Sequence, residues 1–263
     1  MTESPFNTAV FRMRRNSLVG DSLKAYDVPE RVRTYDIDMD VMHPLRHKMI
    51  EIILDILPFD QEAALKVMDL GVGTGIFSAR VLQRFPNSKV TAIDGAEAMM
   101  DIATERLGPM ADRLNWIIAD FRQLPAETLL ADSYDLVISS YALHHLNAGE
   151  KSALLKKVVC ALKPGGWFLN ADIVVAEHES IEQRLQQLRV EGVTSRASAS
   201  DKRFASVEST RAYLSQMQIA ENDQPQTAAI DLKIICEAGL PAAEIFWKEL
   251  NEVVIGGPKP ADR

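Results

Sequence analysis

The sequence contains few cysteines and no long apolar run. Cys160 and Cys236 are the only cysteines among the 263 residues. Both lie in apolar patterns typical of helices, so we expect two buried free thiols rather than a disulfide or a metal-binding pair. No stretch of about 18 consecutive apolar residues occurs, so a membrane-spanning helix is not expected. The N-terminus lacks the basic and then apolar pattern of a signal peptide. These features predict a cytoplasmic protein with no membrane partner.

An excess of positive charge is also missing, because the formal net charge is −8. Proteins that bind RNA or DNA usually present a basic face, whereas the basic cluster Arg12-Met13-Arg14-Arg15 is short and close to the N-terminus. A nucleic-acid substrate is therefore disfavoured. The hydrophobic content of 47% and the charged content of 25% are ordinary for a globular protein. The length predicts a single large domain over residues 1–263 that buries a sizeable core.

The most informative segment is Val67-Met68-Asp69-Leu70-Gly71-Val72-Gly73-Thr74-Gly75-Ile76. An apolar run ends at Asp69 and is followed by glycines at alternate positions, Gly71, Gly73 and Gly75. This pattern predicts a buried strand, a tight turn and the first turn of a helix. Glycine lets bare backbone approach a ligand, and the start of the helix points free N–H groups toward it. We therefore expect these residues to bind a nucleotide-type cofactor, although a purely structural glycine turn is the alternative.

The spacing of the glycines favours one kind of cofactor. A dinucleotide-binding loop has the pattern G-x-G-x-x-G, but here the third glycine comes one residue early. Asp69 would repel a pyrophosphate and attract an ammonium group. S-adenosylmethionine (SAM) has an ammonium group, a ribose and an adenine, and no phosphate. The motif thus favours SAM over the NAD of an oxidoreductase.

Further short strands with polar ends follow this motif. They are Val90–Asp94, Asn115–Phe121 and Tyr134–Ser140, and a turn at Leu162–Gly166 leads into another strand. Ligands of open α/β sheets bind at the carboxyl ends of the strands. We therefore predict that Asp94 accepts hydrogen bonds from the ribose, that Asp120 accepts one from the adenine amine, and that Phe121 or Met99 packs on the adenine ring. Gly95 and Ser139 complete the predicted cofactor-binding set.

Together these elements resemble the class I SAM-dependent methyltransferases. The matching segments are Asp69–Gly75, Ile93–Asp94, Ala119–Phe121, Tyr134–Val137, Ala142–Leu146 and Leu162–Gly166, and they cover roughly residues 35–175. The resemblance implies a doubly wound, mostly parallel seven-stranded sheet of Rossmann-like type with helices on both faces, closed by a strand hairpin within residues 244–259. It is strongest to the small-molecule branch, which includes the enzyme that makes carboxymethyl-SAM for tRNA modification.

Segments outside the sheet are expected to cover the site. Residues 1–42 form an N-terminal arm, polar and irregular to about residue 38, and residues 177–226 form an inserted helical cap with a small, polar, mobile loop at 194–200. Helices are predicted at 43–57, at 147–162 with Asn147 as N-cap, at about 209–220, and at 227–238 with Gly239 as the stop. Because methyl transfer benefits from excluding water, the arm and the cap are predicted to act as a lid.

Candidate catalytic residues are His144 and His145, which follow the fourth strand, and Tyr35 in the arm. A structural role for the histidines, through hydrogen bonds to the backbone, is the alternative. The other histidines have no partner at ligand spacing, so no metal is predicted.

The favoured function is methyl transfer from SAM to an oxygen or nitrogen of a small molecule. Handling of a modified SAM, a catalytically silent SAM-binding partner subunit, and an NAD-dependent oxidoreductase are the alternatives. A homodimer is also considered.

Overall fold

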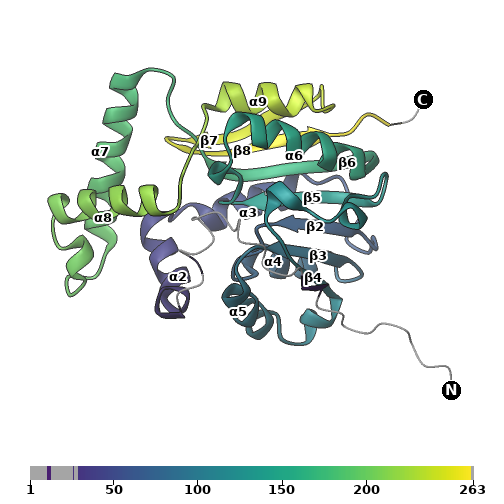
Figure 1. Cartoon of the computed structure of the whole chain (residues 1–263), viewed down its shortest axis with the longest axis horizontal. Helices are drawn as coiled ribbons and strands as arrows, with labels where there is room; N and C mark the ends of the chain where they lie inside the picture. The colour runs from purple at the N-terminus through teal and green to yellow at the C-terminus, as the bar shows by residue number, and fades with distance from the viewer. Residues whose placement is uncertain (1–10, 13–25, 27–28, 262–263) are drawn as a thin grey trace.

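Parallel strands and the helices that connect them form the centre of the molecule (Figure 1). The computed structural model describes residues 11–12, 26 and 29–261. The strands are β1 Phe11–Arg12, β2 Lys66–Leu70, β3 Lys89–Asp94, β4 Leu114–Ile118, β5 Tyr134–Ser140, β6 Leu162–Ile173, β7 Glu244–Glu249 and β8 Glu252–Pro258. The helices are α2 Pro29–Met42, α3 Arg46–Ile56, α4 Ile76–Arg84, α5 Glu97–Leu107, α6 Ala148–Ala161, α7 Glu179–Arg196, α8 Val207–Ala220 and α9 Ala228–Glu237. Short 3-10 turns η1 Gly108–Arg113, η2 Phe121–Gln123, η3 Ala126–Leu129, η4 Leu143–His145 and η5 Lys202–Phe204 connect them.

The strands lie in the order β1-β4-β3-β2-β5-β6-β8-β7. β1 to β6 pair in parallel, and β8 is antiparallel to both β6 and β7. The two-residue β1 at the edge adds to the seven strands that the resemblance implies, so the predicted fold class and the C-terminal hairpin are confirmed. The chain winds outward from β2 through β3 and β4, and then returns to β5 on the other side of β2. Such a reversal leaves a crevice at the carboxyl ends of the two central strands.

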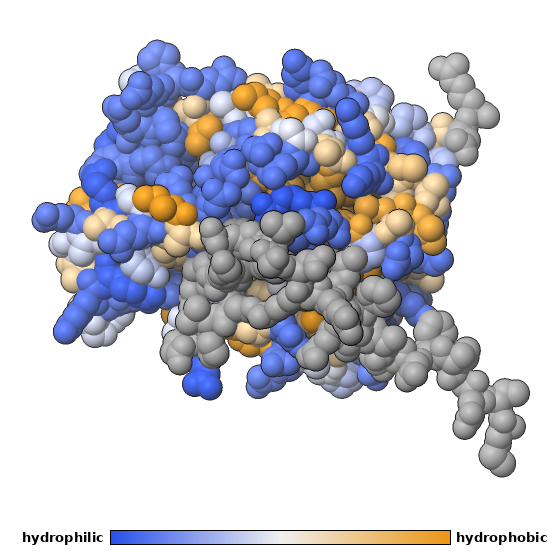
Figure 2. Space-filling model, viewed as in Figure 1, coloured by the Kyte–Doolittle hydropathy of each residue, from blue (hydrophilic) through white to orange (hydrophobic). Residues whose placement is uncertain are grey.

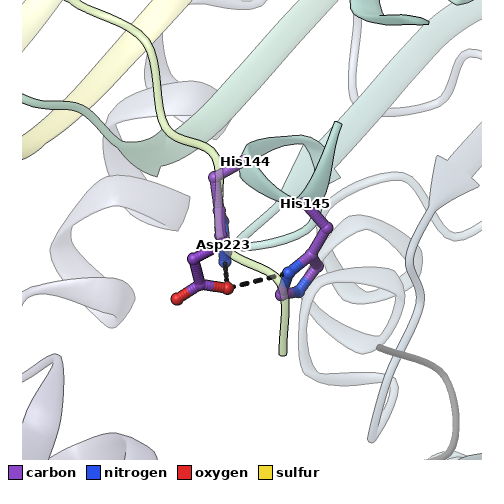
Figure 3. A group of neighbouring side chains, drawn as sticks. All are labelled: His144, His145 and Asp223. Carbon is purple, nitrogen blue, oxygen red and sulfur yellow. Dashed lines mark ion pairs between the residues drawn. The ribbon is translucent and has the colours of Figure 1, made fainter. Parts of the chain in front are cut away.

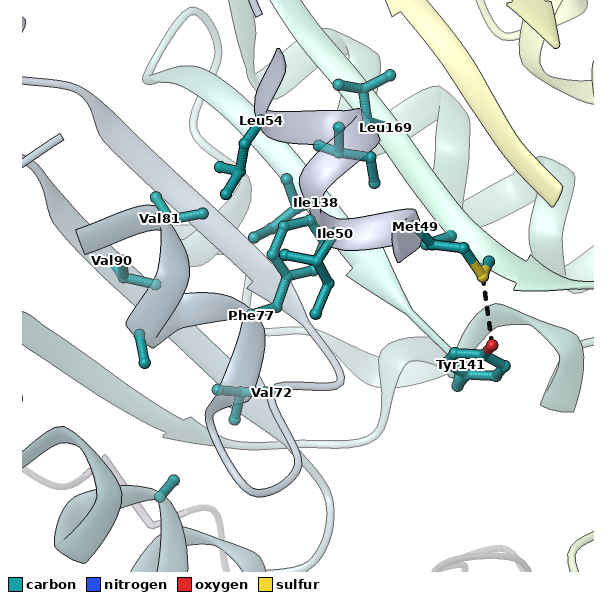
Figure 4. Close-up of a cluster of buried hydrophobic side chains, with 14 of the residues drawn as sticks. Met49, Ile50, Leu54, Val72, Phe77, Val81, Val90, Ile138, Tyr141 and Leu169 are labelled. Carbon is teal, nitrogen blue, oxygen red and sulfur yellow. Dashed lines mark hydrogen bonds between the residues drawn. The ribbon is translucent and has the colours of Figure 1, made fainter. Parts of the chain in front are cut away.

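Alternate residues along each strand enter two separate cores, as a sheet covered on both faces requires. On β2, Val67 belongs to the core beneath α3, α4 and α5, whereas Met68 belongs to the core beneath α6 and α9. On β5, Ile138 and Val137 divide in the same way. Figure 4 shows the first of these cores, in which side chains of α3 and α4 pack on the central strands. The sheet thus fixes the strand ends on which the candidate site is built.

The N-terminal arm differs from the expectation. Residues 29–42 form helix α2, so the prediction of irregular chain up to about residue 38 is wrong over this range. Val32, Tyr35, Met39 and Met42 have the spacing of one helical face, and they pack on the core or on α5. The surrounding residues are so polar that this narrow stripe is easily overlooked. The rest of the arm, apart from residues 11–12 and 26, lies outside the described residues.

Most helix predictions are close to the structure. Asn147 caps α6 through the predicted capping box, in which its side chain accepts from the Glu150 N–H and the Glu150 carboxylate accepts from the Asn147 N–H, each at 3.0 Å. α7 continues to Arg196, so the predicted loop at 194–200 begins later than expected. Whether the loop is mobile stays a prediction.

Cys160 and Cys236 are free thiols, as expected, but the expectation that both are buried is wrong for Cys160. Cys160 is exposed because it lies on the outer face of α6 beside the buried Val159.

The face of the molecule shown in Figure 2 is largely hydrophilic over α7 and α8. Within the described residues, no helix combines the length and the apolarity needed to cross a bilayer.

Candidate functional site

A cavity opens at the carboxyl ends of β2, β3 and β5, where the sheet order reverses. We call it the cofactor cavity. Most of the residues predicted from the sequence line it, namely Tyr35, Gly71, Gly73, Asp94, Gly95, Met99, Asp120, Phe121 and His145. The remaining wall comes from Tyr26, Ala119, Arg122, Ser140, Tyr141, Ala142 and Leu146. The tertiary structure therefore brings together residues from four strand ends and from α2.

The glycine loop is closely packed around Gly71 but leaves space around Gly73. Gly71 has a φ of +81°, and a Cβ there would lie 2.4 Å from the Cβ of Ala142, so no larger residue can be accommodated. Within the part of the chain that the structure describes, a Cβ at Gly73 would meet only the Gly71 carbonyl oxygen, at 3.9 Å. The backbone N–H of Gly73 donates to Asp94 Oδ2 at 2.8 Å, and that of Ala96 donates to Asp94 Oδ1 at 2.9 Å. Asp94 thus joins the glycine loop to the end of β3.

Asp69, Gly75 and Ser139, although predicted as cofactor-binding, do not line this cavity. Asp69 is buried and accepts a hydrogen bond from Ser78 Oγ at 2.6 Å, and burial raises its pKa to about 7. Gly75 is the N-cap of α4, where a Cβ would lie 2.9 Å from Ala103 Cβ. Ser139 Oγ donates to the Leu70 carbonyl at 2.8 Å. Each of these residues supports the loop and the strand ends from within the protein.

Asp120 is engaged by a residue that the sequence reasoning missed. The guanidinium of Arg122 donates to both carboxylate oxygens of Asp120, with the shortest contact from Nη2 to Oδ2 at 2.7 Å. This hydrogen bonding raises the pKa of Arg122. The sequence pattern that could have indicated this pair is an arginine two residues after an aspartate at a short turn. A hydrogen bond from adenine to Asp120, as predicted, must therefore share the carboxylate with Arg122.

A second cavity lies beside the first, and we call it the acceptor cavity. Tyr26, Tyr35 and Tyr141 line both cavities, so the two are neighbours. The rest of the lining comes from α2, α7, α8 and the strand ends, and consists of Asp38, Met39, Met42, His43, His144, Ile173, Arg189, Tyr213, Leu214, Met217, Gln218, Glu221 and Asp223. The predicted arm and cap are thus both represented in its walls.

Tyr141 is another residue that the sequence reasoning missed. It follows β5 with a φ of 48°, a conformation that is costly for a bulky side chain and is often found at functional sites. Its hydroxyl donates to Glu252 Oε1 at 2.8 Å, and it also lies 3.2 Å from the sulfur of Met49 (Figure 4). These contacts fix the ring between the two cavities.

Figure 3 shows His144 and His145 directed toward the carboxylate of Asp223. His144 Nδ1 donates to the buried Asp172 Oδ1 at 2.6 Å, and Asp172 also accepts from the His144 backbone N–H. Burial lowers the pKa of His144, but the charge and hydrogen bond of Asp172 outweigh burial, so that the pKa lies above its ordinary value. His144 Nε2 is left facing Asp223 Oδ1 at 3.6 Å, on the wall of the acceptor cavity.

His145 has a different environment. Its Nδ1 lies 2.9 Å from Asp223 Oδ1, and its Nε2 lies 3.4 Å from the hydroxyl of Tyr26. Burial and the charge of His144 lower the pKa of His145. The two histidines are therefore distinguished by their partners, and only His144 has a buried carboxylate behind its ring. The segment that carries Asp223 is tied to the histidine turn by a hydrogen bond from the Gln224 N–H to the His144 carbonyl at 2.7 Å.

The nitrogen and oxygen atoms of His144, His145 and Asp223 lie within 4.8 Å of one another, which is close enough to hold a metal ion. The expectation of no metal therefore stays a prediction that needs a chelator experiment. Sequence reasoning could not identify Asp223 as a partner of the histidines, since no spacing pattern connects residues so far apart.

A family model described as a methyltransferase domain matches residues 67–166. The malonyl-[acyl-carrier protein] O-methyltransferase of Priestia megaterium is 31% identical over 137 residues, which cover 52% of this chain and 46% of that protein. An uncharacterized methyltransferase of Geobacillus kaustophilus is 32% identical over 131 residues, which cover 50% of this chain and 57% of that protein. The chain thus spans about half the length of the curated relatives it matches.

Solved structures show the same fold. One chain of the complex between the Haloferax volcanii Trm112 methyltransferase activator and a methyltransferase superposes with a TM-score of 0.61 at 19% identity, covering 92% of this chain and 99% of that one. Human N-acetylserotonin methyltransferase in complex with SAM superposes with a TM-score of 0.52 at 19% identity, covering 91% of this chain and 62% of that one. The sheet order and these solved structures show the fold of the class I SAM-dependent methyltransferases, and residues 67–166 match a methyltransferase domain.

Proposed function

We propose that this protein transfers the methyl group of SAM to a hydroxyl oxygen of a small molecule bound in the acceptor cavity, with His144 as the general base. The observation that carries the proposal is the pairing of His144 Nδ1 with the buried Asp172, which leaves Nε2 on the wall of that cavity. A carboxylate behind a histidine fixes the tautomer and stabilises the imidazolium that forms when the ring accepts a proton.

The cofactor cavity has features that suit SAM. Space beside Gly73 lets the cofactor approach the backbone, Asp94 offers a carboxylate for the ribose hydroxyls, and Met99 and Phe121 offer apolar surface for the adenine. Bound SAM supplies an electrophilic methyl group on a sulfonium. The adjoining position of the two cavities, with tyrosines common to both, would place an acceptor next to that methyl group.

In the proposed reaction the acceptor hydroxyl gives its proton to His144 Nε2. The oxygen then forms a bond to the methyl carbon while the bond from carbon to sulfur breaks, and S-adenosylhomocysteine leaves as a neutral thioether. The name of the Priestia relative, an O-methyltransferase, agrees with an oxygen acceptor. A nitrogen acceptor would need no base if its amine were neutral, so the role of His144 separates the two cases.

The test compares the parent with His144→Gln, Asp172→Asn and the control His178→Gln, which replaces an exposed histidine at the start of α7. Methylated products are detected by mass after incubation with SAM and a panel of phenols, alcohols and amines. His144→Gln should lower kcat roughly 10²–10⁴-fold while SAM affinity is retained. The rate of the parent should rise with pH through a pKa above 6.5, because only neutral His144 acts as a base. In Asp172→Asn the plot of the remaining rate against pH should have its midpoint at a lower pH, because the charge that raises the pKa of His144 is removed.

Equal rates for His144→Gln and the parent would contradict the base role. Binding of SAM without turnover of any acceptor would instead favour the silent partner subunit. Stabilisation by NADH and not by SAM would favour an oxidoreductase, and a response to carboxymethyl-SAM alone would favour handling of a modified SAM. Activity should survive incubation with EDTA, since the proposed reaction uses no metal ion at His144, His145 and Asp223.

We also propose that the arm with α2 and the cap at 177–226 close over the site as a lid. Both segments contribute walls to the acceptor cavity, and Tyr35 of α2 lines both cavities. Hydrogen exchange should show amides of residues 29–42 and 197–206 gaining more protection with S-adenosylhomocysteine than the sheet strands do. Equal protection of these segments without ligand would mean that the cover is a fixed wall.

A further inference from the structure

A third cavity lies beneath α7, and we call it the distal cavity. It shares Met42, His43, Ile173, Arg189 and Gln218 with the acceptor cavity, so the two cavities adjoin at these side chains. Apolar residues form much of its wall, namely Pro44, Leu45, Val174, Val175, Leu185, Leu188, Pro225 and Leu250. Arg189 thus lies between the cavity that contains His144 and an apolar cavity beside it.

The carboxylates that line the distal cavity already have cationic or hydroxyl partners. Glu252 Oε1 accepts from His43 Nδ1 at 3.0 Å and from the Tyr141 hydroxyl at 2.8 Å. Glu249 is paired with Lys48 at 3.0 Å. On the acceptor side, Asp38 is held by two hydrogen bonds of 2.7 Å from one guanidinium, that of Arg203. The acids of these walls are thus partly neutralised by the protein itself.

Arg189 differs from these residues. Its Nε is buried and has no hydrogen-bond partner among the described residues. Among the described residues, its Nη2 has a single long contact of 3.5 Å with His43 Nε2, and no carboxylate forms an ion pair with it. Burial lowers the pKa of Arg189, although the more distant Asp223 and Glu252 partly offset this effect. Arg189 is partly buried, and a buried N–H of a cation that lacks a hydrogen-bond acceptor is costly, so this group is suited to bind an anionic ligand.

We propose that Arg189 is the anchor for an oxyanion, a carboxylate or a phosphate, carried by the acceptor at a distance from the methylated oxygen. This inference rests on the proposed function, because it places the acceptor in the adjoining cavity. The planar guanidinium of arginine binds such groups through two parallel hydrogen bonds. Arg196 lies two turns further along the same face of α7 and also lines the distal cavity; it donates from Nε to the Val41 carbonyl at 2.9 Å and adds positive charge at this end of the cavity. The acceptor class is therefore an anionic small molecule with an apolar body.

The anchor can be tested without methyl transfer. Calorimetry measures the binding of hexanoate, of its neutral analogue hexanamide and of inorganic phosphate to the full chain without SAM. We expect hexanoate or phosphate to bind saturably, and hexanamide to bind at least tenfold more weakly than hexanoate, because charge-assisted hydrogen bonds are lost. Binding of hexanoate would identify a carboxylate as the natural group, and binding of phosphate alone would identify a phosphate.

The variants are Arg189→Gln, Arg189→Lys and the control Arg184→Gln, which removes the same charge from an exposed position on α7. Arg189→Gln should weaken oxyanion binding at least tenfold, Arg189→Lys should weaken it less, and Arg184→Gln should leave it unchanged. The melting temperature of Arg189→Gln without ligand should not fall, because no carboxylate among the described residues pairs with the replaced cation. Unchanged affinity in Arg189→Gln, or no saturable oxyanion binding by the parent, would overturn the proposal. SAM affinity, measured in parallel, reports on the proposed function separately.

Discussion

Replacement of Asp69 by asparagine tests how the carboxylate beneath the glycine loop is used. Asp69 is 1% exposed, and its Oδ1 is buried without a hydrogen-bond partner among the described residues. Burial is the main cause that raises its pKa from 3.8 to about 7, and the charge of Asp94 adds to this effect. Asparagine keeps an oxygen that can accept from Ser78 Oγ but cannot ionise. Asp69→Asn should therefore remove a pH-dependent cost while the geometry is retained.

The magnitude follows from proton linkage. Between pH 3.8 and about 7 the folded state holds the proton of Asp69 while the unfolded state has lost it, so the free energy of unfolding falls as pH rises. One pKa unit corresponds to about 1.4 kcal/mol. At pH 5 the carboxyl is largely ionised in the unfolded state and protonated in the folded state. The free energy of unfolding therefore falls over about 2 pH units, from pH 5 to the folded pKa near 7, and then levels off. The stability of Asp69→Asn relative to the parent should thus increase by about 3 kcal/mol between pH 5 and pH 8.

Urea unfolding of both proteins at pH 5.0 and pH 8.0 measures this difference, and the comparison between the two pH values cancels any constant effect of the substitution. Asp101→Asn, which replaces an exposed aspartate on α5, serves as the control and should show no such trend. A stability difference between Asp69→Asn and the parent that does not change with pH would refute the reasoning. Asp69 would then be ionised in the folded protein, as its predicted interaction with the ammonium group of SAM requires.

Three further substitutions address the cofactor cavity and the core. Asp94→Ala should weaken SAM binding at least tenfold by calorimetry, because a charge-assisted acceptor is worth about 1.5–3 kcal/mol; unchanged affinity in a folded variant would remove Asp94 from the site. Gly73→Ala should lose SAM affinity, whereas Gly165→Ala, which has a comparable positive φ but lies on the surface, should retain it; equal losses would point to backbone strain alone. Lys151→Met should reduce the free energy of unfolding by about 3–5 kcal/mol, because it leaves the buried Asp231 without its partner at 2.7 Å. A loss below about 1 kcal/mol, within the range of exposed pairs, would contradict this burial argument.

The strands and the glycine loop could be predicted from the sequence because their signals are local. The apolar run before Asp69 predicted β2, and the alternate glycines predicted the turn into α4. Asn147 with Glu150 gave the start of α6. Such patterns depend on neighbouring residues, on strand alternation and on helix caps, and they do not require knowledge of what lies across the sheet. Helix α2 was missed because its apolar stripe is narrow and its stability depends on packing against α5 and the core.

The chemistry of the candidate site was decided by the tertiary structure. The sequence by itself determined that His144 follows a strand end, but it could not show that Asp172 lies behind the ring or that Asp223 lies in front of it. It also placed Asp69 and Ser139 at strand ends without showing which side of the strand faces the cavity, because a shift of one residue reverses the direction of a side chain. The pKa of a histidine and the unpaired Nε of Arg189 among the described residues depend on burial and on groups from distant segments. These properties exist only once the chain has folded.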